Sequence, residues 1–116
     1  MDIEYNNNAQ KYKELGNQAY KNQDYNRAIS YYTKAIEADP SEPNFFSNRS
    51  LCFYNLNKYE QCIQDCEKAL SLNPNFVKVL KKKSQACLNI LKFNEAVEAA
   101  KQVVTIERST SANNEL

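Results

Sequence analysis

The sequence has no histidine and no tryptophan, one glycine, three prolines and one methionine in 116 residues. Without histidine, the chain lacks the side chain that most often acts as general base and as zinc ligand. A single glycine argues against a hairpin-rich β fold, because hairpin turns favour glycine. No apolar run approaches the roughly 20 residues that a membrane-spanning helix requires. These absences favour long helices with few breaks.

The sequence contains no known catalytic motif. There is no glycine-rich phosphate loop and no recognisable arrangement of nucleophile and base. The four cysteines form no Cys-x-x-Cys pair and are Cys52, Cys62, Cys66 and Cys87. Reduced thiols packed as small apolar residues are the expected state for such cysteines. We therefore expect no enzymatic activity, no catalytic residue, no metal ion and no cofactor.

The charges nearly balance, with 15 basic and 14 acidic residues and a net charge of +1. This balance predicts neither a nucleic-acid nor a membrane partner. The first residues, Met1 to Tyr5, have neither the basic start nor the apolar stretch of a signal peptide. We expect a cytoplasmic protein.

Residues of similar type recur at a fixed interval along the chain. Tyr25, Tyr59 and Phe93 are evenly spaced, and the same interval relates many other apolar positions. Such a period indicates a tandem repeat of one supersecondary unit. The predicted repeats cover 9–42, 43–76 and 77–108, which together form one domain over 9–108. A disordered or frayed N-terminus is expected over 1–8, and a C-terminal tail or the start of a truncated capping helix over 109–116.

Each repeat has the spacing of two helices. In the first repeat, Tyr25, Ala28, Ile29 and Tyr32 follow steps of three and four, which place them on one helical face. The first helices of the repeats are predicted over 9–22, 43–56 and 77–90. The second helices are predicted over 25–38, 59–72 and 93–107. The fold class is therefore all-α.

The first repeat resembles the tetratricopeptide repeat. The residues that carry the resemblance are Leu15, Gly16, Tyr20, Ala28, Tyr32, Ala35 and Pro40. Tyr12 stands where the family often has tryptophan, and Ser50 and Ser84 replace the glycine in the later repeats. The resemblance covers nearly the whole chain. It implies helix-turn-helix units stacked in a right-handed superhelix, with the first helices lining a concave groove.

The predicted first and second helices differ in charge. The first helices carry eight basic residues and one acidic residue, whereas the second helices carry four basic and seven acidic residues. One layer of this nearly neutral protein should therefore attract anions. A run such as Lys81-Lys82-Lys83 is usually a solvated helix face, and at most two of these three side chains can face one groove.

Five positions on the first helices resemble the two-carboxylate clamp of chaperone-binding tetratricopeptide proteins such as the co-chaperone Hop. This clamp set consists of Lys13, Asn17, Asn48, Lys78 and Lys82. Lys82 departs from the pattern, because arginine is usual there and lysine lacks its planar fork. The resemblance implies binding of the C-terminal Glu-Glu-Val-Asp tail of a 90-kDa or 70-kDa heat-shock chaperone. Tyr20 resembles the pocket tyrosine of 90-kDa-binding modules and favours that partner.

Further groove positions would set specificity beyond the terminal aspartate. By repeat position these are Tyr20, Asn44, Ser47, Leu51, Tyr54, Asn55, Lys81, Gln85 and Leu88.

Two other functions remain open. A scaffold that binds internal peptide segments or itself would not need a free peptide carboxylate. Nucleic-acid binding would use the lysines, with tyrosines stacking on bases, although most tyrosines fall at predicted core positions. The third repeat has no predicted cap, so Val103, Val104 and Ile106 are expected to be partly uncovered, and a homodimer through this repeat is possible.

Overall fold

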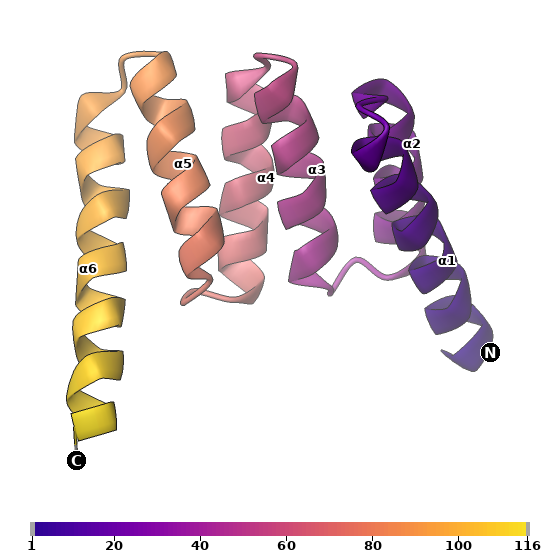
Figure 1. Cartoon of the computed structure of the whole chain (residues 1–116). Helices are drawn as coiled ribbons and strands as arrows, with labels where there is room; N and C mark the ends of the chain where they lie inside the picture. Colours follow the sequence, from indigo (N-terminus) through magenta and orange to yellow (C-terminus); the bar gives the residue numbers. More distant parts are fainter. Residues whose placement is uncertain (1, 116) are drawn as a thin grey trace.

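A computed structural model describes the backbone of residues 2–115 and the side chains of residues 8–112. Over this part of the chain it contains helices and turns and no strand, which confirms the all-α prediction. The helices are α1 (Asp2–Lys21), α2 (Tyr25–Ala38), α3 (Pro43–Asn55), α4 (Tyr59–Leu72), α5 (Val77–Asn89) and α6 (Phe93–Glu115). They stand side by side in chain order, with the termini at opposite ends of the stack (Figure 1).

The inner helix ends agree closely with the predicted ranges, but the two outermost ends do not. Helix α1 starts at Asp2 and therefore includes most of the segment expected as a frayed end, while Met1 lies outside the described residues. Helix α6 continues to Glu115 without the break that a separate capping helix would need, and Leu116 lies outside the described residues. Neither outer stretch contains proline or glycine, so nothing in the local sequence stops these helices.

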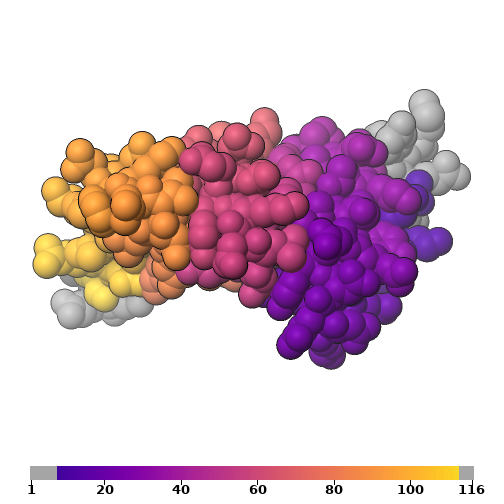
Figure 2. Space-filling model, turned by 90° about the horizontal axis from the view of Figure 1, so that it is seen from above, coloured from indigo at the N-terminus to yellow at the C-terminus, as the bar shows by residue number. Residues whose placement is uncertain are grey.

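The helices pack pairwise within each repeat, and the second helix of one repeat packs against the first helix of the next. The seams between them are lined by small residues, among which Ala28, Cys62, Ala35 and Ala69 are fully buried. Small side chains allow the helices to approach closely, as the sequence predicts. Seen from above, the three repeats follow one another from one end of the molecule to the other (Figure 2).

All four cysteines are buried and free. Burial raises the pKa of the Cys52 thiol to about 12, so this side chain is neutral at physiological pH. Because all four thiols are buried, they pack as small apolar groups, in agreement with the sequence analysis.

The turn inside each repeat uses a residue in the left-handed backbone region. These residues are Gln23, Asn57 and Leu91, with φ angles of 62°, 60° and 62°. They occupy the same position in successive repeats, so the turn recurs with the repeat period. None of them is glycine, although glycine adopts this conformation at the lowest cost.

The last repeat leaves part of α6 uncovered, but not every residue that the sequence analysis expected to be exposed is exposed. Val104 is 46% exposed, as expected. Val103 is buried and Ile106 is half-buried, because both pack with Leu80 of α5. The prediction is therefore wrong for Val103, which belongs to the inner face of α6. Within residues 2–115, no helix combines the length and apolar character that crossing a bilayer requires.

Candidate functional site

A polar pocket of about 250 Å³ lies between α1 and α3. Three members of the clamp set line it: Lys13 and Asn17 from α1, and Asn48 from α3. Lys13 and Asn17 are one helical turn apart, so the helix places both on one face. The structure thus joins residues from two repeats in one pocket, which we call the α1–α3 pocket.

The amide of Asn17 is held in a fixed orientation by a residue of α2. The Tyr32 hydroxyl donates a hydrogen bond of 2.5 Å to Asn17 Oδ1. Burial raises the pKa of Tyr32, so the hydroxyl remains protonated and continues to donate. Because this bond occupies the amide oxygen, the Asn17 NH₂ group is left to donate to a ligand.

The ring of Tyr32 reaches Asn17 only because position 16 is glycine. A Cβ atom at Gly16 would lie 2.6 Å from the Tyr32 ring, a distance that real side chains do not tolerate. The sequence analysis assigned Gly16 and Tyr32 to the repeat pattern and missed their support of the α1–α3 pocket. The sequence signal for this support is a glycine directly before Asn17, combined with a large aromatic residue, Tyr32, at a core position of the second helix.

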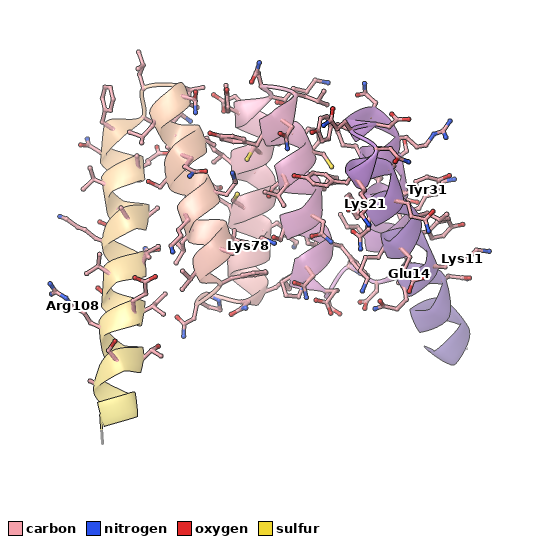
Figure 3. The ribbon with its side chains drawn as sticks, viewed as in Figure 1. Lys11, Glu14, Lys21, Tyr31, Lys78 and Arg108 are labelled. Atoms are coloured by element: carbon pink, nitrogen blue, oxygen red, sulfur yellow. The ribbon has the colours of Figure 1, made fainter. Side chains whose placement is uncertain are left out.

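The two lysines of the clamp set on α5 lie outside the lining of this pocket. Lys82 places its ammonium 4.0 Å from the ring centroid of Tyr54 on α3, a cation–π contact. The Tyr54 hydroxyl accepts a 3.4 Å hydrogen bond from Asn89, and its ring packs edge-on against Tyr59. Lys78 is exposed on α5, between the two ends of the stack that Lys11 and Arg108 mark in Figure 3.

The three consecutive lysines of α5 point to three different surroundings. Lys81 forms an ion pair of 3.4 Å with Glu107 of α6. Lys82 lies over Tyr54, and Lys83 lines a cleft on the side of α4 and α6. Lys81 was a groove candidate, but its ammonium group is directed toward Glu107 on α6.

Three groove candidates, Tyr20, Tyr54 and Asn55, take part in a series of hydrogen bonds between successive first helices. Asn55 donates to the Tyr20 hydroxyl at 3.2 Å, and Asn89 donates to the Tyr54 hydroxyl in the same way one repeat later. Each asparagine also donates to a carbonyl one turn back in its own helix, which fixes its side chain. Tyr20 further lines a hollow of about 550 Å³ together with Asn17.

The remaining candidates differ in exposure. Asn44 lines the α1–α3 pocket, Gln85 and Leu88 are exposed, and Leu51 is half-buried. Ser47 is only 3% exposed, so its side chain is not available to a ligand and the prediction is wrong for this residue.

An acidic residue in the α1–α3 pocket was not predicted. Glu42 caps α3, where its carboxylate accepts hydrogen bonds from the backbone N–H and the side-chain amide of Asn44, at 3.2 and 2.7 Å. Its negative charge lies in the same lining as Lys13. The sequence signal for it is the pair Glu42-Pro43 at the start of a helix.

The repeat period, the paired helices and the basic first-helix layer define an α-helical tandem-repeat protein. Profiles described as the tetratricopeptide repeat match residues 9–42 and 43–76. The chain belongs to the tetratricopeptide repeat family.

Relatives of the chain include co-chaperones. It is 34% identical over 112 residues to "Hsp70-Hsp90 organizing protein 3" of Arabidopsis thaliana, covering 87% of this chain and 20% of that protein. The chain therefore spans about a fifth of the length of this relative.

Solved structures of similar fold contain bound peptides. The second TPR of Spaghetti (RPAP3) bound to HSP90 peptide SRMEEVD has a TM-score of 0.83 and 30% identity, covering 85% of this chain and 92% of that chain. The second TPR domain of human RPAP3 in complex with HSP70 peptide SGPTIEEVD has a TM-score of 0.83 and 28% identity, covering 93% and 88%.

Proposed function

We propose that this chain is an adaptor module without catalytic activity that binds the C-terminal Glu-Glu-Val-Asp tail of a heat-shock chaperone. The clamp set holds the two carboxylates of the terminal aspartate. The observation that carries the proposal is the meeting of Lys13, Asn17 and Asn48 in the α1–α3 pocket. Lys78 and Lys82 on α5 would contact the peptide from the next repeat.

The chemistry of these side chains suits a doubly negative chain end. A carboxylate is an acceptor only, and lysine and asparagine supply donors. Lysine adds charge, whereas asparagine adds direction, which in Asn17 is set by its bond from Tyr32. Charge-assisted hydrogen bonds contribute about 1.5–3 kcal/mol each, and ordering a flexible peptide offsets part of this gain. A micromolar dissociation constant, about −8 kcal/mol, is the expected outcome.

The 90-kDa chaperone is the preferred partner in this proposal. The preference rests on Tyr20, whose hydroxyl is fixed by Asn55 and whose ring borders Asn17 in a hollow beside the α1–α3 pocket. The two similar structures described above hold an HSP90 peptide and an HSP70 peptide, so the fold itself is compatible with either tail. Parallel titration with both tails measures the preference.

Calorimetric titration with a Glu-Glu-Val-Asp peptide tests the proposal. The free acid should bind, and the same peptide with an amidated C-terminus should bind at least about tenfold more weakly, because it loses one carboxylate. Equal binding of both peptides would instead support the scaffold that recognises internal segments. The nucleic-acid alternative would be supported if the chain bound neither peptide but bound an oligonucleotide, with an affinity that falls steeply as the salt concentration rises.

Self-association through the third repeat is a further part of the proposal. Apolar residues that are at least 46% exposed occur on the last two helices and in the turn between them: Leu88, Leu91, Phe93, Val97 and Val104. A second copy of the chain would cover this exposed apolar surface. Sedimentation at several protein concentrations tests it, and a monomer at all of them would rule the dimer out. The cytoplasmic location expected from the sequence stays a prediction for cell fractionation.

A further inference from the structure

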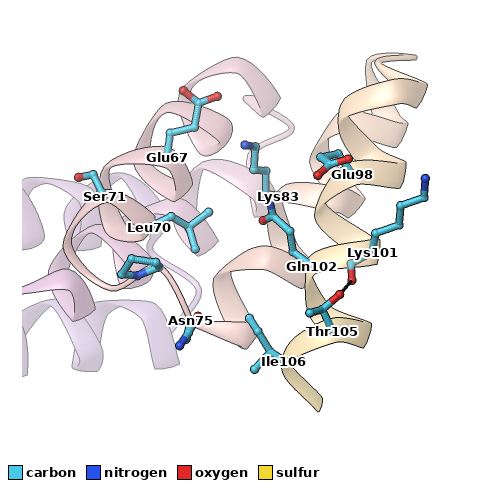
Figure 4. A pocket seen from close by; sticks show the side chains of 11 residues that line it. Glu67, Leu70, Ser71, Asn75, Lys83, Glu98, Lys101, Gln102, Thr105 and Ile106 are labelled. Atoms are coloured by element: carbon cyan, nitrogen blue, oxygen red, sulfur yellow. Dashed lines mark hydrogen bonds between the residues drawn. The ribbon is translucent and has the colours of Figure 1, made fainter. Parts of the chain in front are cut away.

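A cleft of about 610 Å³ lies on the opposite helix layer, between α4 and α6 (Figure 4). Its apolar part is formed by Leu70, Pro74 and Ile106, and Lys83 enters it from α5. None of its lining residues belongs to the clamp set or to the α1–α3 pocket. The volume falls within the range of about 300–1,000 Å³ that is usual for ligand pockets. We call it the α4–α6 cleft.

The equivalent junction one repeat earlier, between α2 and α4, is bridged by the protein itself. Arg49, the counterpart of Lys83 in the second repeat, donates two hydrogen bonds of 2.8 Å to the carboxylate of Asp65 on α4. It also donates a 3.1 Å hydrogen bond to Thr33 on α2. Asp65 is only 5% exposed, so the bridge is an internal part of this junction. The basic residue of the first helix thus has its carboxylate partner within the chain.

The α4–α6 cleft keeps the basic residue, but the buried carboxylate that faces it in the preceding junction is absent. Ala99 occupies the position of Asp65 in the next repeat and offers no acceptor, although it is equally buried at 3% exposure. Among the side chains of residues 8–112, no carboxylate lies within 4.0 Å of the half-buried Lys83 ammonium. The cleft therefore presents a cation without the carboxylate that its register position has in the preceding junction.

We propose that the α4–α6 cleft is a second docking site, which takes an internal segment of a partner protein with one carboxylate beside an apolar side chain. The carboxylate forms an ion pair with Lys83, in the place that Asp65 takes beside Arg49, and the apolar side chain packs against Leu70 and Ile106. Glu67 and Glu98 flank Lys83 at the rim (Figure 4) and repel additional negative charge, so one acidic residue fits and an acidic cluster does not. No free chain end is required, which separates this site from the clamp and makes it independent of the function proposed above.

The probe for this site is the blocked dipeptide acetyl-Leu-Glu-amide, which has one side-chain carboxylate and no terminal one. Titration into the ¹⁵N-labelled chain should give saturable amide shifts at Leu70, Lys83 and Ile106. Acetyl-Leu-Gln-amide should bind roughly fivefold or more weakly, since it lacks the charge that pairs with Lys83. Equal binding of the two dipeptides, the absence of saturable shifts, or shifts confined to Asn17 and Asn48 would overturn the proposal.

Variants locate the effect on the cation in the cleft. Lys83→Gln should reduce acetyl-Leu-Glu-amide affinity by the same factor. The matched variant Lys68→Gln, at an exposed lysine of α4 outside the cleft lining, should change it less than about twofold. The double variant Lys83→Arg with Ala99→Asp recreates the bridge of the preceding junction and should abolish binding. Equal effects of Lys83→Gln and Lys68→Gln would contradict the assignment even if the double variant failed to fold. Binding of the chaperone-tail peptide should be unchanged in Lys83→Gln.

Discussion

The first and second repeats pack the same two helical positions with different pairs of residues. In the first repeat Gly16 faces the ring of Tyr32, and a Cβ atom would come within 2.6 Å of it. In the second repeat the corresponding pair is Ser50 and Cys66, which are both buried. The large ring of Tyr32 on α2 leaves no room for a side chain at position 16 on α1. The small thiol of Cys66 on α4 leaves room for the Ser50 hydroxyl on α3.

The difference also decides what each repeat can do. The large side chain of Tyr32 reaches through the seam to Asn17 and orients it in the α1–α3 pocket. The Ser50 hydroxyl instead donates to the Ser47 carbonyl within its own helix, at 2.6 Å. The first repeat therefore has no hydroxyl at position 16 but has a fixed donor in the α1–α3 pocket, while the second repeat contributes packing at the same place.

The largest expected effect comes from moving the residue of the second repeat into the first. Gly16→Ser should destabilise the fold by roughly 3 kcal/mol, because the new side chain overpacks against the Tyr32 ring. Chemical denaturation followed by circular dichroism measures this loss. The double variant Gly16→Ser with Tyr32→Cys reproduces the second-repeat pair. It should lose less stability than the sum of the losses of Gly16→Ser and Tyr32→Cys measured separately, because the overpacking disappears while the cavity left by the ring remains. Losses that add fully would contradict the pairing argument.

A second effect follows from comparing Lys13 with the same position in the next repeat, Ser47. Lys13 lines the α1–α3 pocket, whereas Ser47 is buried. Lys13→Ala should weaken binding of a Glu-Glu-Val-Asp peptide by about tenfold or more, through loss of a charge-assisted hydrogen bond. Asn48→Ala should act in the same direction. Calorimetry measures both, and the helical signal should not change. Unaltered affinity in either variant would count against the clamp.

The fold followed from the sequence because the repeat carries its own register. The helix ends inside the stack are marked by turn residues and prolines. The repeat period gives the same end positions in each of the three repeats. The ends of α1 and α6 were not predicted, since no breaker residue marks them. Directions of individual side chains were harder to infer. Lys81 turns to Glu107 because α6 continues far enough to present that carboxylate, which the predicted helix end only just included.

The α1–α3 pocket was predictable in part. Lys13, Asn17 and Asn48 were found through the family resemblance, but the roles of Tyr32 and Glu42 depend on contacts between helices. The α4–α6 cleft could not be predicted from a single repeat. Ala99 stands where Asp65 supplies a carboxylate one repeat earlier, and the consequence for Lys83 becomes visible only when both junctions are compared in three dimensions.

Removing the hydroxyl oxygen of Tyr32 separates the packing of its ring from its hydrogen bond to Asn17 in the α1–α3 pocket. Tyr32→Phe keeps the ring beside Gly16 but leaves Asn17 Oδ1 without its donor. We expect a stability loss of about 1 kcal/mol. We also expect a several-fold lower affinity for the chaperone-tail peptide, because the Asn17 amide is then free to rotate. Denaturation and calorimetry measure the two effects. The control is Tyr31→Phe on the same helix, which should leave peptide affinity unchanged. Full affinity in Tyr32→Phe would show that Asn17 needs no orientation.

The smallest expected effect concerns the turns, where Asn57 of the second repeat corresponds to Leu91 of the third. Both have φ near 60°, a conformation that asparagine tolerates better than leucine. Leu91→Asn should therefore stabilise the fold by about 0.5 kcal/mol, measured by denaturation at fixed protein concentration. The reverse exchange, Asn57→Leu, should cost more than this, since Asn57 also accepts a 2.9 Å hydrogen bond from the Tyr59 hydroxyl. Phe93 replaces that tyrosine in the third repeat and has no hydroxyl, so Leu91→Asn isolates the backbone contribution.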